Sequence, residues 1–135
     1  MVGIIIVTHG ELGKTLISTA QSITGSIGDI KCIAVKNGDS AEDIRKSIAA
    51  AIKELDKGAG VLIFTDMFGG TPSNISLSFL EDNKVEVLTG VNLPMLLKLY
   101  SHRNNKTLSE LAELLKTNGQ NSIVLASEVL KKGSE

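Results

Sequence analysis

Apolar residues along this chain follow two alternating patterns. Short apolar runs occupy residues 2–7 and 61–64, which is typical of strands buried on both faces, and residues 30–35, which include Lys31, are predicted to form another strand. Between these runs, apolar residues recur every three or four positions over residues 12–23, about 41–57 and 93–102, which predicts amphipathic helices. Strands that alternate with helices predict a doubly wound α/β fold, with a mainly parallel sheet covered by helices on both faces.

The remaining segments complete this alternation. Residues 72–80 are predicted to be helical, and residues 84–88 alternate between apolar and polar, which favours a strand near the sheet edge. Thr107 and Glu110 have the spacing of a capping box, which predicts a helix from residue 108 to about Gly119. Residues 122–126 are predicted to form a last short strand, and residues 131–135 a frayed tail.

The expected strand order brings two polar residues together. If the strands, numbered along the chain, are arranged 2-1-3-4, the first and third strands are neighbours where the order reverses. Ligands of such folds bind at that point, outside the carboxyl ends of the strands. His9 follows the first strand and Asp66 follows the third, so we expect these two residues to face each other.

Residues 65–74, with the sequence TDMFGGTPSN, have the features of a sharp turn into a helix. Two glycines allow the backbone to bend and to approach a ligand closely. Thr71 is the predicted N-cap and Pro72 the first helical residue. The free amides of such a first turn bind anions, so the candidate phosphate ligands are Gly70, Thr71, Ser73 and Asn74. Helix capping is the competing interpretation of Asn74.

A histidine beside a carboxylate and a helix N-terminus is suited to accepting a phosphoryl group. If Asp66 accepts a hydrogen bond from Nδ1–H of His9, then Nε2 keeps its lone pair and can attack phosphorus. The chain has no G-x-x-x-x-G-K-[ST] motif, so nothing indicates nucleotide binding. A phosphohistidine donor would require no ATP, and we therefore expect no cofactor and no metal.

Composition restricts the possible partners and the cellular location. A net charge of −1 and only 3% aromatic residues argue against binding to nucleic acid or to anionic membranes. No apolar run is long enough to cross a bilayer, and no basic stretch typical of a signal peptide precedes the first one. The single cysteine, Cys32, indicates a reducing compartment. We therefore expect one cytoplasmic domain that spans residues 1–135.

Two motifs together resemble the mannose-type enzyme IIA of the bacterial sugar phosphotransferase system. These are residues 4–10, IIIVTHG, and the more specific residues 65–74, and the resemblance covers nearly the whole chain. It implies that His9 receives a phosphoryl group from the histidine-containing phosphocarrier protein. His9 would pass the group to a histidine-bearing IIB component, which serves a membrane IIC/IID permease for sugar uptake. It also implies that Asp66 orients the histidine and that Thr71 contacts the phosphate.

The resemblance further implies a homodimer in which a C-terminal strand, here residues 122–126, is exchanged between subunits. The sequence has no Ala/Pro-rich linker to a IIB domain, so we expect a stand-alone IIA domain. Phe68, at the rim of the predicted site, is interpreted as a partner contact, with burial in the core as the alternative. His102 lies at a polar helix end and is interpreted as having no role in transfer.

Three other functions remain open from the sequence. The same fold serves as the phosphotransfer subunit of dihydroxyacetone kinase, which also uses a histidine after the first strand. A regulatory phosphoprotein without a role in transport is a second alternative. A small-molecule binding module would use the same crevice without phosphoryl transfer. The sequence does not indicate which sugar is transported.

Overall fold

A four-stranded parallel sheet forms the centre of the computed structural model, which describes residues 1–134. Its strands are β1 (Gly3–His9), β2 (Ile30–Val35), β3 (Val61–Thr65) and β4 (Val85–Thr89). They are arranged in the order β2-β1-β3-β4, and every neighbouring pair is parallel. The predicted order and the edge position of β4 are therefore confirmed.

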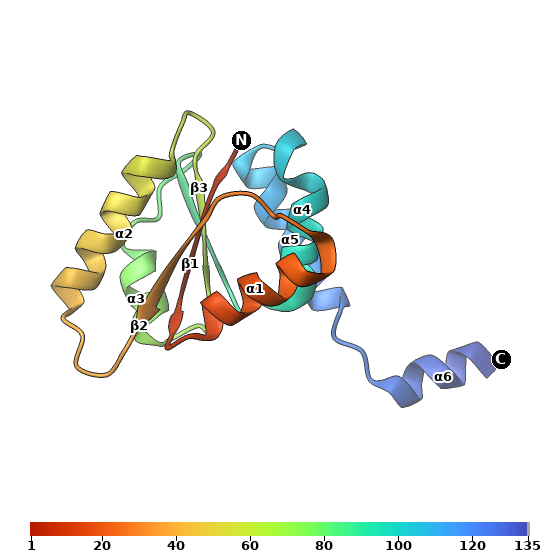
Figure 1. Cartoon of the computed structure of the whole chain (residues 1–135). Coiled ribbons are helices and arrows are strands. Elements are labelled where there is room, and N and C mark those ends of the chain that lie inside the picture. Colours follow the sequence, from red (N-terminus) through yellow and green to blue (C-terminus); the bar gives the residue numbers. More distant parts are fainter. Residues whose placement is uncertain (135) are drawn as a thin grey trace.

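Helices cover both faces of this sheet (Figure 1). One face carries α1 (Leu12–Thr24), α4 (Leu93–His102) and α5 (Leu108–Asn121), and the other carries α2 (Ala41–Leu55) and α3 (Thr71–Leu77). A short 3₁₀ turn, η1 (Arg103–Asn105), joins α4 to α5. The doubly wound α/β fold expected from the sequence is confirmed.

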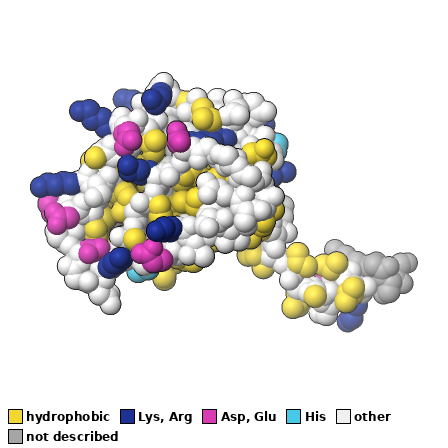
Figure 2. Space-filling view, viewed as in Figure 1, with side chains coloured by type: hydrophobic (Ala, Val, Ile, Leu, Met, Phe, Trp, Pro, Cys, Tyr) yellow, Lys and Arg dark blue, Asp and Glu magenta, His cyan; other side chains and the backbone are white. Residues whose placement is uncertain are grey.

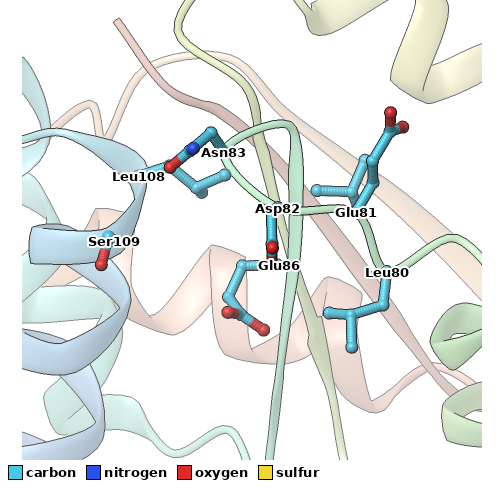
Figure 3. A pocket seen from close by; sticks show the side chains of 8 residues that line it. Leu80, Glu81, Asp82, Asn83, Glu86, Leu108 and Ser109 are labelled. Atoms are coloured by element: carbon cyan, nitrogen blue, oxygen red, sulfur yellow. The ribbon is translucent and has the colours of Figure 1, made fainter.

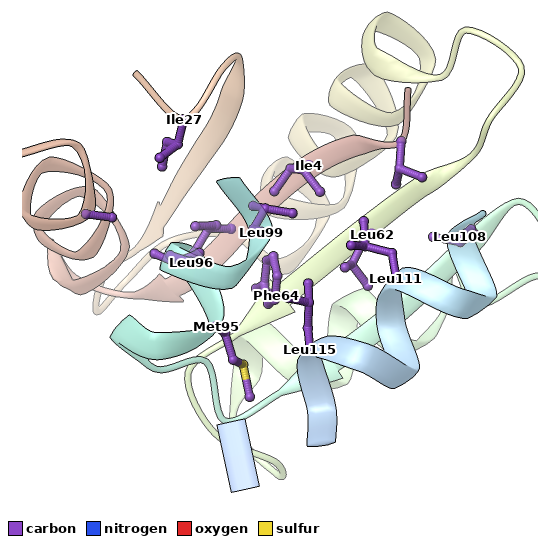
Figure 4. Close-up of a cluster of buried hydrophobic side chains, with 13 residues drawn as sticks. Ile4, Ile27, Leu62, Phe64, Met95, Leu96, Leu99, Leu108, Leu111 and Leu115 are labelled. Atoms are coloured by element: carbon purple, nitrogen blue, oxygen red, sulfur yellow. The ribbon is translucent and has the colours of Figure 1, made fainter. Parts of the chain in front are cut away.

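The unbroken apolar runs are explained by helices packing against both faces of the strands. Ile4, Ile6 and Phe64 point into a cluster with the leucines of α4 and α5 (Figure 4). The intervening Ile5 and Val7 point into a second cluster, beneath α2 and α3. Because successive strand residues face opposite sides, both sets have to be apolar.

Two helix boundaries differ from the predictions. Gly70, rather than Thr71, is the N-cap of α3. Its backbone is extended, and because glycine has no side chain, no side-chain hydrogen bond caps this end of the helix. Thr71 is therefore the first residue of this helix. Gly119 does not end α5, which continues to Asn121. This glycine lies against Met95, and a Cβ at position 119 would come within 2.3 Å of the Met95 Cε atom, so close helix packing explains it.

The C-terminal predictions were wrong for this chain. Residues 123–125 form no strand, and their apolar side chains are exposed, that of Ile123 by 80%. Residues 131–134 are not frayed but belong to α6 (Ala126–Ser134), while Glu135 lies outside the described residues. This helix extends away from the body and carries apolar side chains (Figures 1 and 2).

Candidate active site

His9 and Asp66 are in contact at the carboxyl edge of the sheet. His9 is the last residue of β1, and Asp66 follows the last residue of the adjacent strand β3. Asp66 Oδ2 accepts a hydrogen bond from the His9 backbone amide at 3.0 Å and lies 2.8 Å from His9 Nδ1. The histidine side chain is 49% exposed, whereas the aspartate side chain is only 10% exposed. The expectation that these residues face each other is confirmed.

The charge on Asp66 determines which ring nitrogen of His9 carries the proton. Burial alone would raise the pKa of Asp66, but the hydrogen bonds from the backbone and ring of His9 outweigh it and hold this pKa below its usual value. An ionised carboxylate can only accept hydrogen bonds, so Nδ1 must be the donor. In the neutral ring, Nε2 therefore keeps a free lone pair.

Gly70 places the start of α3 directly against the His9 ring. A Cβ atom at position 70 would lie 2.7 Å from Cε1 of His9 and 3.2 Å from Nε2. The preceding Gly69 has a φ of +95°, a conformation that other residues rarely adopt. The two glycines therefore serve different purposes. Gly69 allows the turn, and Gly70 leaves room for the ring.

The other predicted phosphate ligands occupy two kinds of environment. Thr71, the first residue of α3, and Asn74 are exposed, and the Asn74 amide group donates weakly to the Gly69 carbonyl at 3.5 Å. Ser73 is fully buried. Its hydroxyl donates to the Met67 carbonyl oxygen and lies 2.6 Å from Thr65 Oγ1. The structure thus separates Ser73 from the exposed residues of the same turn.

On the opposite side of the site, a second buried hydroxyl supports the turn after β1. Thr8 Oγ1 accepts a hydrogen bond from the Gly13 amide at 2.9 Å, which attaches the first turn of α1 to the end of the strand.

Apolar side chains next to the site are exposed. Phe68, two residues after Asp66, is 72% exposed, and the neighbouring Met67 is also exposed. The alternative of burial in the core is therefore excluded for Phe68, and its role as a partner contact stays a prediction. His102 is the last residue of α4, which begins just after the carboxyl end of β4 and runs back toward the opposite edge of the sheet.

A hollow lies at the amino edge of the sheet, opposite the His9 site (Figure 3). Its volume is about 320 Å³, and it is lined by Glu81, Asp82, Glu86 and Leu108, among others. These residues surround the beginning of β4, so the hollow is remote from His9. Within residues 1–134, no group of three or more histidine, cysteine, aspartate or glutamate side chains is arranged to hold a metal ion.

The sequence resembles known proteins along nearly its whole length. Residues 3–116 match the family described as "PTS system fructose IIA component". The fructose-specific EIIA component of Bacillus subtilis is 32% identical over 133 residues, which cover 98% of this chain and 91% of that protein. The mannose-specific EIIAB component of Escherichia coli is 31% identical over 90% of this chain, which spans only 38% of that longer protein.

Solved structures agree with these matches. The crystal structure of the phosphotransferase system component EIIA from Streptococcus agalactiae superposes with a TM-score of 0.85 at 30% identity. The superposition covers 95% of this chain and 99% of that one. Over residues 1–134, no helix combines the length and the apolar character needed to span a bilayer.

Proposed function

This chain belongs to the mannose-type IIA family of the sugar phosphotransferase system, and on that premise we propose that His9 carries the phosphoryl group. The observation that supports the proposal most directly is the 2.8 Å contact between His9 Nδ1 and Asp66 Oδ2 beside a half-exposed ring. Because this contact occupies Nδ1, Nε2 is the nitrogen of the half-exposed ring that is available as the nucleophile.

The proposed reaction transfers a phosphoryl group between two histidines. Nε2 of His9 attacks the phosphorus of a phosphohistidine on the phosphocarrier protein. The new N–P bond forms as the N–P bond to the donor histidine breaks, and the donor ring leaves with the electron pair of that bond. His9 keeps its proton on Nδ1, and the Asp66 carboxylate stabilises the positive charge that the ring gains.

We assign the transferred phosphoryl oxygens to the half-buried Gly70 and to the exposed Thr71 and Asn74 at the start of α3. Gly70 adjoins the ring, and the first-turn amides of a helix have no intrahelical acceptor. Because Ser73 is buried and its hydroxyl is already bonded, we give it a different role. The exposed Phe68 would contact the partner protein.

The proposed partners are the phosphocarrier protein as donor and a IIB component as acceptor. Through IIB the chain would serve a membrane IIC/IID permease in sugar uptake. The proposal places it in the cytoplasm as a single-domain homodimer that requires no cofactor and binds no nucleic acid. The similar proteins are described as fructose-specific and mannose-specific, so we assign no particular sugar to this chain.

The test is phosphorylation by a phosphorylated phosphocarrier protein. We expect one phosphoryl group per chain, at Nε2 of His9, with the lability in acid and stability in base of a phosphoramidate. His9→Gln keeps a polar side chain but removes the nucleophile, so labelling should disappear while the fold is retained. His102→Gln should be labelled like the wild type. ATP with Mg²⁺ alone should give no label.

Two results would decide against the proposal. Acid-labile phosphate that persists in the His9→Gln protein would place the acceptor elsewhere. A labelled protein that discharges to dihydroxyacetone kinase but not to any IIB component would exclude the role in sugar uptake.

A further inference from the structure

We propose that Ser73 is a positioning residue for phosphoryl transfer, because its buried hydroxyl fixes the loop that carries Asp66 to His9. This inference rests on the proposed function of His9. The Ser73 side chain contacts neither the ring nor the exposed surface of the site. It would act through the backbone of the loop.

The two hydrogen-bond partners of Ser73 lie on either side of Asp66 in the sequence. One partner is the hydroxyl of Thr65, the last residue of β3, at 2.6 Å. The other is the backbone carbonyl of Met67. A single side chain therefore holds the chain immediately before and immediately after the carboxylate, which defines where Asp66 points.

Ser73 is the donor in one of these two hydrogen bonds and the acceptor in the other. A serine hydroxyl has one hydrogen, and Ser73 donates it to the Met67 carbonyl. In the other bond the Thr65 hydroxyl is therefore the donor and Ser73 Oγ the acceptor. Replacing Ser73 removes both bonds, whereas replacing Thr65 removes only one and leaves the bond to Met67 intact.

The same hydroxyl also connects the Asp66 loop to the first turn of α3. Ser73 is in the first turn of this helix, three residues after Gly70. The backbone of Gly70 adjoins Cε1 and Nε2 of the His9 ring. Ser73 therefore connects Asp66, which orients Nδ1, to Gly70, which adjoins Nε2. Loss of this attachment should loosen both sides of the ring together.

Ser76 provides a matched control on the same helix. It is also a fully buried serine in α3, but its hydroxyl has no hydrogen-bond partner within residues 1–134. Ser73→Ala and Ser76→Ala thus delete the same atom from the same helix. Only the first deletion removes contacts to the Asp66 loop.

The first measurement is the rate of phosphoryl transfer from the phosphocarrier protein. For Ser73→Ala we expect kcat to fall about 10- to 100-fold, the range observed when the partner that orients a functional group is removed. The KM for the phosphocarrier should stay within roughly twofold, because the exposed docking surface is unchanged. Ser76→Ala should keep the wild-type kcat and KM.

The second measurement does not depend on phosphoryl transfer. In the unphosphorylated protein, ¹⁵N NMR of the His9 ring should show a protonated, slowly exchanging Nδ1 in the wild type and in Ser76→Ala. In Ser73→Ala the Nδ1–H signal should exchange faster and the fraction of the other tautomer should rise. A purely structural role in α3 would leave the ring signals unchanged.

Thr65→Val keeps the inference testable even if Ser73→Ala does not fold. This variant removes only the hydroxyl that donates to Ser73 and leaves the bond from Ser73 to Met67. We therefore expect kcat to decrease less than in Ser73→Ala, again with little change in KM. If both variants fold, their double mutant should be no slower than Ser73→Ala alone, because the bond between the two residues is already lost.

The inference is overturned if Ser73→Ala retains the wild-type kcat and ring spectrum, or if Ser76→Ala impairs transfer equally. If Ser73→Ala does not fold, a wild-type kcat and ring spectrum in Thr65→Val overturn it as well. Failure of the proposed function gives a different result, since the wild-type protein itself would then accept no phosphoryl group.

Discussion

At the scale of single residues, one carboxylate oxygen fixes both the backbone and the side chain of His9. Asp66 Oδ2 accepts from the amide nitrogen and from the ring nitrogen of the same histidine. The ring therefore cannot rotate about its side-chain bonds without losing a bond to an anchored acceptor. This double contact orients Nε2 before any partner binds, which reduces the entropic cost of reaching the reactive geometry.

Asp66→Asn should change how stability depends on pH. The pKa of Asp66 is lower in the folded protein than in the unfolded chain, where it is about 3.9. The carboxylate therefore stabilises the wild type fully above the unfolded pKa, and this contribution decreases as pH falls through the lower, folded value. The difference in unfolding free energy between wild type and Asp66→Asn should therefore shrink as the pH falls below about 4.

Urea titrations at several pH values would measure this difference. If the difference in unfolding free energy instead widens as the solution is acidified, the folded protein raises the pKa of Asp66 rather than lowering it.

The sequence predicted the positions of His9 and Asp66 because each follows a buried apolar run, and such runs end at a common sheet edge. It could not predict the role of Ser73. Spacing shows that Ser73 belongs to the first turn of a helix, but not that its hydroxyl is buried and bonded to the Asp66 loop. Residue spacing determines the helix face approximately, whereas this contact depends on the path of the loop.

At the scale of elements, strands were predicted most reliably and helix ends least. The apolar runs of β1 and β3 require burial on both faces, which the two central strands of this sheet have, whereas the edge strand β2 is only partly buried. Helix ends depend on tertiary contacts that the local sequence does not contain. Gly119 has the usual signature of a helix end, yet its closeness to Met95 keeps it inside α5.

The contact between the start of α3 and the end of β1 should not tolerate a methyl group. Gly70 has φ −90° and ψ 171°, which alanine can adopt, so Gly70→Ala should fold. Its Cβ would be 2.7 Å from Cε1 of His9, so the ring must move by several tenths of an ångström. We expect phosphoryl transfer to slow roughly 10- to 100-fold, as is typical of ångström-scale misplacement.

Transfer kinetics and circular dichroism would be measured together. Gly69→Ala is the contrasting variant, because its Cβ would have no neighbour within 4 Å among the described residues, but its backbone φ of +95° would be strained. It should lose stability, by about 1–2 kcal/mol. An unimpaired transfer rate in Gly70→Ala would show that the ring is not confined by this helix.

At the scale of the whole molecule, the chain leaves apolar surface uncovered at its C-terminal end. Ile123, Val124 and Leu125 are exposed, and so are Val129 and Leu130 of α6. β4 is the sheet edge nearest in sequence to this segment, and its outer side has no strand partner within residues 1–134. The predicted fifth strand is not formed within one chain, and its exchange between subunits stays a prediction, in which the exposed segment would pair with a second chain.

If the proposed homodimer forms through this segment, deletion of residues 123–135 should abolish it. The deletion spares α5, which ends at Asn121, so the sheet and both cores should remain folded. We expect monomer or aggregate in place of a dimer, measured by light scattering coupled to size-exclusion chromatography. A stable dimer of the truncated protein would show that the subunits associate through another surface.

The half-exposed ring of His9 has a consequence for the lifetime of the proposed phosphorylated state. A phosphoryl group on this half-exposed ring is reachable by a partner and by bulk water alike, so spontaneous hydrolysis competes with every productive transfer. The protein would then conserve the energy of the N–P bond only by discharging faster than water attacks it. Efficiency would depend on the concentration of the acceptor. In a cell that lacks an acceptor, the label on His9 would decay at a rate close to that of a free phosphohistidine.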